Sequence, residues 1–339
     1  MPLLKTIDEL KRYVALDTVG ILPSFALELQ EAESYFLLPL LGAPLAKWLQ
    51  QQYDGAGFDP ADGSLAAQLL AVVQAPLARL ATTDAITVHQ VTLDETGVHI
   101  VSNDKVKTAF QWQSNELRDH YQRRGFRGLD ALVQWLEDHR DDSNELKAWA
   151  TSRAGLRHRQ ELFTSTADFH EFENISESRL VFLALKSVRR RVEAFELRTV
   201  LGEEFLAELL EQVRTRTLTS ENEMLLTSRV YPALASLTIG RAIPTLALRL
   251  SGEGIDLQVA RLDDSNSKEA DAGLDALLQQ RAGEAFLMGE RYLRQLRDFL
   301  DRAASSTRFA TYFNSSAYTD LSKPAAEINT VDSKVYKFC

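Results

Sequence analysis

The sequence contains a single cysteine, and it is the last residue, Cys339. No disulfide can form within one chain, and this usage is typical of proteins in a reducing compartment. The chain also lacks an excess of positive charge, since its formal net charge is −10 at pH 7. A general nucleic-acid binder needs a basic surface to displace counterions. The charge balance therefore disfavours sequence-specific nucleic acid as a partner, and it favours either solubility or contact with a basic protein surface.

Long hydrophobic runs are absent as well. Residues 1–20 carry charges and have no apolar core of the kind found in signal peptides. The most apolar stretch, residues 35–49, is too short to span a bilayer. The sequence therefore predicts a protein that is neither secreted by the usual route nor integral to a membrane.

Motifs of catalysis and cofactor binding are missing from the sequence. It contains no G-x-S-x-G, P-loop or Rossmann fingerprint, and no H-x-x-x-H or C-x-x-C spacing. His89 and His99 lie on opposite arms of a predicted hairpin, where a solvated surface explains them better than a metal site. We predict no catalytic residue, no cofactor-binding residue and no metal ligand, so the chain is not expected to be an enzyme.

What the sequence does contain is a repeat. Residues 75–101 and 232–258 align at a fixed offset of 157 with seven identities in 27 positions, including Leu80 with Leu237. The similarity continues upstream at an offset of 160, where Gly42 matches Gly202, and downstream at 164, where Gly125 matches Gly289. Small changes of offset between elements are typical of homologous domains. We predict a first repeat at 1–150, a second at 151–305 and a C-terminal arm at 306–339.

The predicted fold class is mainly α with inserted β-hairpins (α+β), as a tandem duplication of a helical domain that carries one hairpin. The apolar period changes from 3.6 to 2 over residues 87–102 and again over 244–260. Gly97 and Gly254 stand in the turns. Trp48, Trp112, Trp135 and Phe299 occupy helical apolar positions and are expected in the core.

Residues 306–339 are rich in Ser, Thr and Asn and contain too little apolar mass for a core of their own. We predict an extended arm that crosses another surface. Aromatic side chains bury a large area for few rotatable bonds, so they are the predicted anchors of the arm. These residues are Tyr312, Phe313, Tyr318 and Tyr336.

Two basic clusters have two possible interpretations. Residues 189–191 are three consecutive arginines, and Arg153, Arg157, His158 and Arg159 lie near the boundary of the repeats. They could contact an acidic partner surface or phosphate, or they could be a solvated helix face and a linker.

The opening sequence LKTIDELKRY, residues 4–13, resembles the start of tailed-phage head–tail connector (adaptor) proteins, which begin with a similar Thr-x-x-Glu-x-x-Lys helix. The whole chain resembles uncharacterised structural proteins of Bacteroidetes prophages. The resemblance implies a virion protein that forms a homo-oligomeric ring, contacts portal, neck or tail subunits and assembles in the bacterial cytoplasm. The duplication departs from the single-domain pattern of connectors.

Three functions remain open from the sequence. The first is a non-enzymatic connector subunit of a phage or phage-tail-like particle, which forms a ring between head and tail components. The second is a cellular helical scaffold or adaptor protein, which would be cytoplasmic. The third is an enzyme with no recognisable motif.

Overall fold

A computed structural model describes residues 3–15, 25–88, 91–94, 97–100, 110–246, 248–251, 254–257 and 267–321. The chain divides into two compact units, which we call unit 1 (Met1–Ala184) and unit 2 (Leu185–Cys339). Each unit is described separately.

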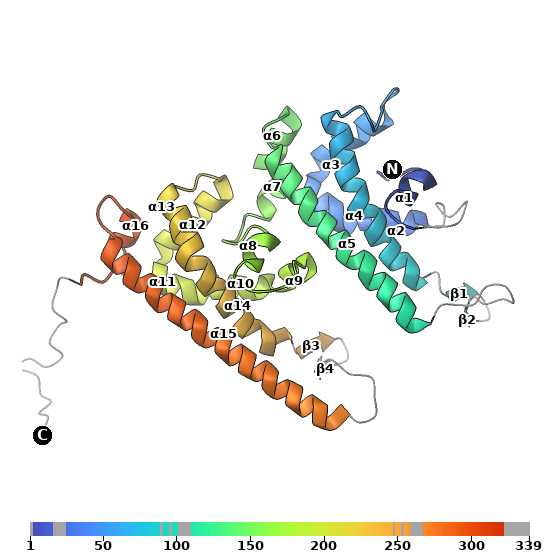
Figure 1. Ribbon diagram of the computed structural model, residues 1–339. Helices are drawn as coiled ribbons and strands as arrows, with labels where there is room; N and C mark the ends of the chain where they lie inside the picture. The colour runs from blue at the N-terminus through green and yellow to red at the C-terminus, as the bar shows by residue number, and fades with distance from the viewer. Residues whose placement is uncertain are drawn as a thin grey trace, which may run out of the picture. The chain divides into compact units, whose positions relative to one another are not determined.

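Unit 1 is built around two long helices, α4 (Leu65–Val88) and α5 (Gln111–Asp138), which pack along each other (Figure 1). Two short strands between them, β1 (Val91–Asp94) and β2 (Gly97–Ile100), pair antiparallel. The other helices of the unit are α1 (Ile7–Lys11), α2 (Ala26–Ala32), the π-helix η2 (Glu33–Leu37), α3 (Leu38–Asp54), α6 (Asn144–Thr151), α7 (Arg153–Arg157), α8 (Thr166–His170) and α9 (Arg179–Ala184).

Unit 2 follows the same order. Its long pair is α14 (Tyr231–Leu246) and α15 (Ser267–Ala303), and β3 (Leu248–Ser251) pairs antiparallel with β4 (Gly254–Leu257) between them (Figure 1). Its other helices are α10 (Lys186–Val192), the π-helix η3 (Glu193–Leu197), α11 (Arg198–Leu201), α12 (Glu203–Thr215), α13 (Ser220–Leu225), the π-helix η4 (Leu226–Val230) and α16 (Ala310–Phe313).

The α+β fold class predicted from the sequence is wrong, because the molecule is helical, with 76% helix. Among the described residues, strands are confined to the two four-residue pairs β1–β2 and β3–β4. The starts of both expected hairpin ranges, 87–102 and 244–260, belong to helices, since α4 runs through Val88 and α14 through Leu246. Packing of the long helices against each other extends them two or three residues into these ranges, despite the local period-2 pattern.

Leucines and glycines at equivalent positions form the interior of each helix pair. Leu80 in α4 and Leu237 in α14 are buried. A Cβ on Gly125 would lie 2.7 Å from Leu80 Cγ, and one on Gly289 would lie 2.5 Å from Leu237 Cγ. Glycine at these two sites lets the helices approach closely enough to enclose the leucines. Four further leucines at equivalent positions of the two repeats are also buried: Leu77, Leu132, Leu234 and Leu296.

The aromatic residues predicted to be core divide into two groups. Trp48, Trp135 and Phe299 are partly buried. The prediction for Trp112 is wrong, because its side chain is 64% exposed. It stands in the first turn of α5, where Ser114 is the buried residue. An apolar residue type alone does not reveal which side of a helix turn faces the core.

A π turn and a left-handed glycine recur in both units. In η2 the N–H of Leu38 donates to the carbonyl of Glu33, and in η3 the N–H of Arg198 donates to that of Glu193. Gly42 (φ 71°) and Gly202 (φ 78°) then break the helix at matching positions. Positive φ is easy only for glycine, so the kink before α12 and inside α3 depends on these residues. Residues that are 160 positions apart in the sequence therefore share the same backbone conformation at this kink.

The short N-terminal helices correspond with a shift of one residue from the sequence alignment. Thr6 caps α1 by accepting from the N–H of Glu9, and Ser165 caps α8 by accepting from the N–H of Asp168. The structural partner of Thr6 is therefore Ser165, whereas the offset of 160 pairs Thr6 with Thr166. An N-cap is the residue whose side-chain oxygen accepts a hydrogen bond from a backbone N–H of the first turn. A match of residue types in an alignment does not identify that residue.

The unit boundary lies between residues 184 and 185, whereas the sequence predicted the repeat boundary at 150 and 151. Residues of α8 and α9 bond to α5 in unit 1: Thr166 and Arg179 both donate to Asp130. A compact unit is defined by contacts within the structure, whereas a repeat is defined by duplication of the sequence. The two boundaries therefore need not coincide. The predicted repeat limits remain a prediction.

Residues 306–321 are not an extended arm. They form a turn, the helix α16 and a second turn, and α16 packs on α12 within unit 2. Phe309 and Tyr312 are buried against Phe205, with ring centroids 6.0 Å away in both cases. Residues 322–339 lie outside the described part of the chain. The Ser- and Asn-rich composition hid a short helix because its apolar residues pack on a core that the rest of the unit supplies.

Candidate functional site

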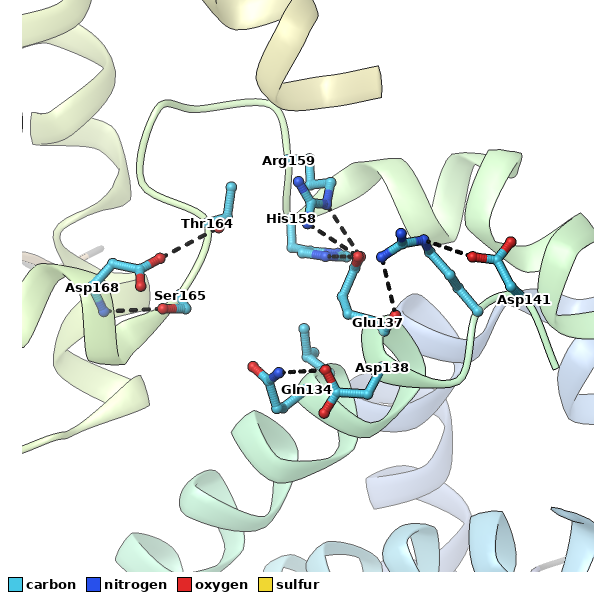
Figure 2. Close-up of a pocket in the computed structure, with 11 residues that line it drawn as sticks. Gln134, Glu137, Asp138, Asp141, His158, Arg159, Thr164, Ser165 and Asp168 are labelled. Atoms are coloured by element: carbon cyan, nitrogen blue, oxygen red, sulfur yellow. Dashed lines mark hydrogen bonds and ion pairs between the residues drawn. The ribbon is translucent and has the colours of Figure 1, made fainter. Parts of the chain in front are cut away.

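A polar cavity of about 440 Å³ lies at the C-terminal end of α5 in unit 1. Figure 2 shows side chains from α5, from the end of α7 and from the start of α8 around it. The cavity is lined by Val133, Gln134, Glu137, Asp138, Arg140, Asp141, His158, Arg159, Thr164, Ser165 and Asp168. The mixture of carboxylates, guanidinium groups and hydroxyls makes it a polar site that could bind a charged group.

The carboxylate of Glu137 is the centre of this site. Arg159 binds it through two bonds, Nε to Oε1 at 3.2 Å and Nη2 to Oε2 at 3.0 Å. His158 Nε2 lies 2.7 Å from Glu137 Oε1. All three side chains are mostly buried, which strengthens their electrostatic attraction. Glu137 therefore fixes the segment after α7 to the end of α5.

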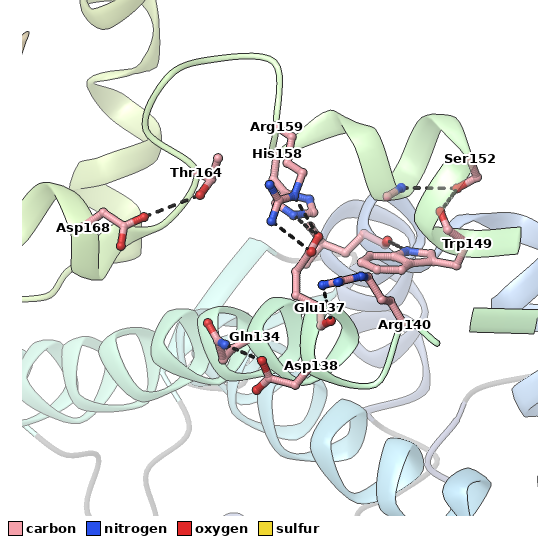
Figure 3. Close-up of polar contacts among 12 residues, drawn as sticks. Gln134, Glu137, Asp138, Arg140, Trp149, Ser152, His158, Arg159, Thr164 and Asp168 are labelled. Atoms are coloured by element: carbon pink, nitrogen blue, oxygen red, sulfur yellow. Dashed lines mark hydrogen bonds and ion pairs between the residues drawn. The ribbon is translucent and has the colours of Figure 1, made fainter. Parts of the chain in front are cut away.

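Trp149 in α6 supports the same cluster from the other side (Figure 3). Its indole ring stacks on His158 with 6.2 Å between centroids and 16° between planes. Its Nε1 donates to the carbonyl of Leu40 in α3 at 2.8 Å. Helices α3, α5 and α6 are thereby joined by one chain of contacts through Trp149, His158 and Glu137.

The remaining polar groups of the cavity bond to one another. Thr164 donates to Asp168, and Ser165 accepts from the N–H of Asp168 as a helix cap. Gln134 donates to Asp138, and Arg140 pairs with Asp141. His158 contacts Glu137, which Arg159 also binds. The arrangement is therefore a polar clamp that joins α5 to the segment after α7.

Unit 2 places an acidic residue at the position equivalent to Glu137, namely Asp301 in α15. Asp301 Oδ1 accepts from the hydroxyl of Tyr312 at 2.7 Å and from the N–H of Thr319 at 3.0 Å. Burial and the bond to Asp301 raise the pKa of Tyr312. In both units, the end of the last long helix holds the segment that follows it through one carboxylate.

The held segments are themselves equivalent. Ser152 donates to the carbonyl of Trp149, and Ser315 donates to that of Tyr312, each at 2.7 Å. Ala154 and Ala317 then lie against Gly42 and Gly202 respectively. Residues 306–321 are thus the counterpart of residues 143–158, at an offset of 163. The shared aromatic-x-x-Ser-x-Ala pattern was present in the sequence, but composition alone concealed it.

The predicted arm anchors occupy different places. Tyr312 is 0% exposed inside unit 2. Phe313 and Tyr318 are partly buried, with ring centroids 4.7 Å apart. Tyr336 lies outside the described residues. The three described anchors contact their own unit, and their role toward another subunit stays a prediction.

The basic clusters are also divided by the structure. Arg153 and Arg157 are exposed, while His158 and Arg159 belong to the clamp on Glu137. Arg189 is buried, while Arg190 and Arg191 are exposed. Of the two histidines considered for a metal, His89 lies outside the described residues and His99 is in β2. Among the described residues no group of three or more potential ligands converges on one point.

The π turns carry the feature that sequence analysis missed. Tyr35 in η2 is 72% exposed and Phe195 in η3 is 69% exposed. They stand at equivalent positions at the offset of 160. The signal was available as a large apolar residue kept at a matching position in both repeats, but exposure could not be read from the alignment.

Comparison with known proteins gives one family. The model of a family of unknown function, DUF6712, matches residues 37–155 and again residues 197–322. The second match includes α16 and the turns around it, so these residues are part of the family's unit. Comparison with curated proteins gives no match, and comparison with solved structures gives none.

One described helix, α4, is apolar and long enough over Leu65–Ile86 to cross a membrane by length and composition. In the structure 67% of that window is buried. The core helix of a helical unit passes the same test, so the finding is weak evidence for a membrane span.

Proposed function

Because the chain belongs to the DUF6712 family and carries the family's unit twice, we propose that it is a non-enzymatic structural subunit that assembles into a ring. The particle would be a phage or a phage-tail-like machine, with the ring between head and tail components. Portal, neck or tail subunits would be its partners, and neither a membrane nor sequence-specific nucleic acid would be required.

The observation that carries the proposal is the repeated exposed aromatic. A helical surface that keeps a large apolar side chain in solvent in both units is a candidate for burial in an interface. A chain with two similar units offers two such surfaces, and oligomers with closed symmetry are built from repeated contacts of this kind. The polar clamp supports the same proposal, because Glu137 and Asp301 are engaged in holding their own units together.

The resemblance of residues 4–13 to connector proteins is the reason for proposing a phage or phage-tail-like particle. In the structure this segment is α1 with a complete capping box between Thr6 and Glu9. Its helix packs Leu10 into the core of unit 1 and leaves Lys11 and Arg12 exposed. Those exposed charges are available to a neighbouring subunit.

Mass photometry of the purified full-length chain, followed by negative-stain electron microscopy, tests the proposal. We expect one discrete assembly of several chains that images as a closed ring. A monomer or dimer at every concentration would contradict a ring and favour the adaptor or enzyme interpretations. Mass spectrometry of particles from a lysogen that encodes the chain tests its place, and its absence from intact particles would contradict a virion role.

A further inference from the structure

Equivalent surfaces of the two units keep an aromatic residue and reverse the charges around it. Tyr35 and Phe195 each stand in a π turn, which widens the helix and is frequent at functional sites. Both side chains are exposed. The surrounding positions can therefore be compared one by one.

On unit 1 the aromatic has acidic neighbours. Glu31 is exposed one turn before Tyr35, and Leu38 is exposed one turn after it. Asp84 comes from α4, which packs against α2. Burial and the charges of Glu31 and Glu28 raise the pKa of Asp84, so the carboxylates are close enough to repel one another. We call Glu31, Tyr35 and Asp84 the acidic face.

On unit 2 the same positions are basic. Arg191 replaces Glu31 at the offset of 160, Arg198 replaces Leu38, and Arg241 replaces Asp84 at the offset of 157. Arg241 pairs with Glu196 at 2.8 Å, which places the end of α14 beside η3. Arg198 pairs with Glu203 at a position exposed to solvent. We call Arg191, Phe195, Arg198 and Arg241 the basic face.

The basic face keeps a net positive charge after its own pairs are counted. Its three arginines and the two glutamates Glu196 and Glu203 sum to +1, whereas Glu31 and Asp84 sum to −2. Two acidic faces, or two basic faces, would place like charges against each other. An acidic face against a basic face brings opposite charges together around two aromatic rings.

We propose that the acidic face of one copy of this chain docks on the basic face of a second copy, with Tyr35 and Phe195 at the centre of the contact. The inference rests on the proposed assembly and names its interface. A second copy is the occupant because one chain carries both complementary halves, and every additional copy carries them too. Exposed aromatic residues within a rim of charges have the composition of interface centres.

Each copy of the chain carries one acidic face and one basic face. Two copies related by a two-fold axis would satisfy both contacts, and larger rings would satisfy them in sequence. The geometry between the units decides which closure forms. The inference concerns the identity of the contact and holds for either closure.

Charge reversal on the full-length chain tests the contact. One variant carries Glu31→Arg and Asp84→Arg, which leaves both of its faces basic. The other carries Arg191→Glu and Arg241→Glu, which makes both of its faces acidic. We expect each variant alone to lose assembly in analytical ultracentrifugation, and an equimolar mixture to regain it because unlike faces meet again.

Two controls accompany the variants. Glu116→Arg makes the same type of change at an exposed position on α5 and should leave assembly unchanged. Circular dichroism should give wild-type helix content for all variants. A variant that assembles alone as well as wild type, or a mixture that stays dissociated with helix content intact, would overturn the contact.

Cross-linking decides whether the contact joins two chains. In a Cys339→Ser background, the single variants Tyr35→Cys and Phe195→Cys are mixed and oxidised. We expect the mixed disulfide to exceed either homodimer at least tenfold. Equal yields of all three products would overturn the pairing of unlike faces. The double variant carries both Tyr35→Cys and Phe195→Cys. If its disulfide forms only within one chain, the contact does not join two copies and the proposal is wrong.

These outcomes separate the inference from the proposed function. Rings that persist in both charge-reversed variants would contradict the contact alone. A closed dimer that the variants abolish would support the contact and contradict the ring. A wild-type chain that stays monomeric would contradict both.

Discussion

Unit 1 and unit 2 have the same packing arrangement, but different side chains stabilise its end. Each encloses a leucine between two long helices beside a glycine, and each ends with a carboxylate that holds the next segment. In unit 1 the partners of Glu137 are a guanidinium group and an imidazole, whereas in unit 2 the partners of Asp301 are a phenol and a backbone amide. The difference indicates that the backbone geometry of the closure matters more than the groups that secure it.

The largest expected effect comes from removing the aromatic residue of each closing segment. Trp149→Ala and Tyr312→Ala should each cost about 3–5 kcal/mol of unfolding free energy, because each leaves a large void in a packed interior. Urea unfolding followed by circular dichroism measures both. A cost under about 1 kcal/mol for one variant alone would show that the two segments are not equivalent. Exposed Trp112→Ala is the matched control and should change little.

The next effect distinguishes the two carboxylates. Glu137→Gln should cost about 2–3 kcal/mol, because it removes the carboxylate charge that the mostly buried Arg159 binds. Asp301→Asn should cost about 1 kcal/mol, because an amide oxygen still accepts from Tyr312. Thermal unfolding of the Glu137→Gln and Asp301→Asn variants shows which substitution lowers stability more. Equal costs would mean that charge plays no special part in unit 1.

The glycines between the long helices give a smaller contrast. Gly289→Ala should cost about 2 kcal/mol by overpacking. Gly125→Ala should cost less, because its new Cβ would lie 3.5 Å from the backbone nitrogen of Leu80, whereas the Cβ on Gly289 would lie 3.0 Å from that of Leu237. Exposed Gly283→Ala, which has open space for a Cβ, is the control. A larger cost at Gly125 would reverse the comparison.

The smallest effect depends on pH. Burial alone would raise the pKa of Glu9, but bonds from Tyr53, from the backbone of Lys5 and Thr6 and from Gln74 outweigh it and lower the pKa below 4.5. A lowered pKa in the folded state adds stability at neutral pH that is lost as the pH falls through the folded-state pKa. Glu9→Gln should therefore cost about 1 kcal/mol at pH 7 and progressively less below pH 4.5.

Urea midpoints at pH 7 and pH 3 test this dependence. Asp8→Asn, on the exposed side of α1, is the control and should show a much smaller difference between the two conditions. A Glu9→Gln cost that is the same at both pH values would contradict the charge-based explanation.

The part of the fold that could be predicted from the sequence is the part repeated in it. The pairs Leu80 with Leu237, Gly42 with Gly202 and Gly125 with Gly289 were aligned correctly, because a core leucine and a glycine in a close approach tolerate few replacements. The fold class was missed because an alternating pattern does not show how few residues will pair as strands beside helices that dominate each unit. The closing segment 306–321 was missed because its apolar residues pack on a core that lies elsewhere in the chain.

The sequence by itself determined the duplication, the helical character, the acidic charge and the positions of the kinks, since each depends on residue type and local order. Only the tertiary structure decided that Trp112 and Tyr35 face solvent while Tyr312 does not, because exposure depends on what packs from distant segments. It also brought Asp84 beside Glu31 and Arg241 beside Glu196, charges that are far apart in the chain and act together only after the helices pack.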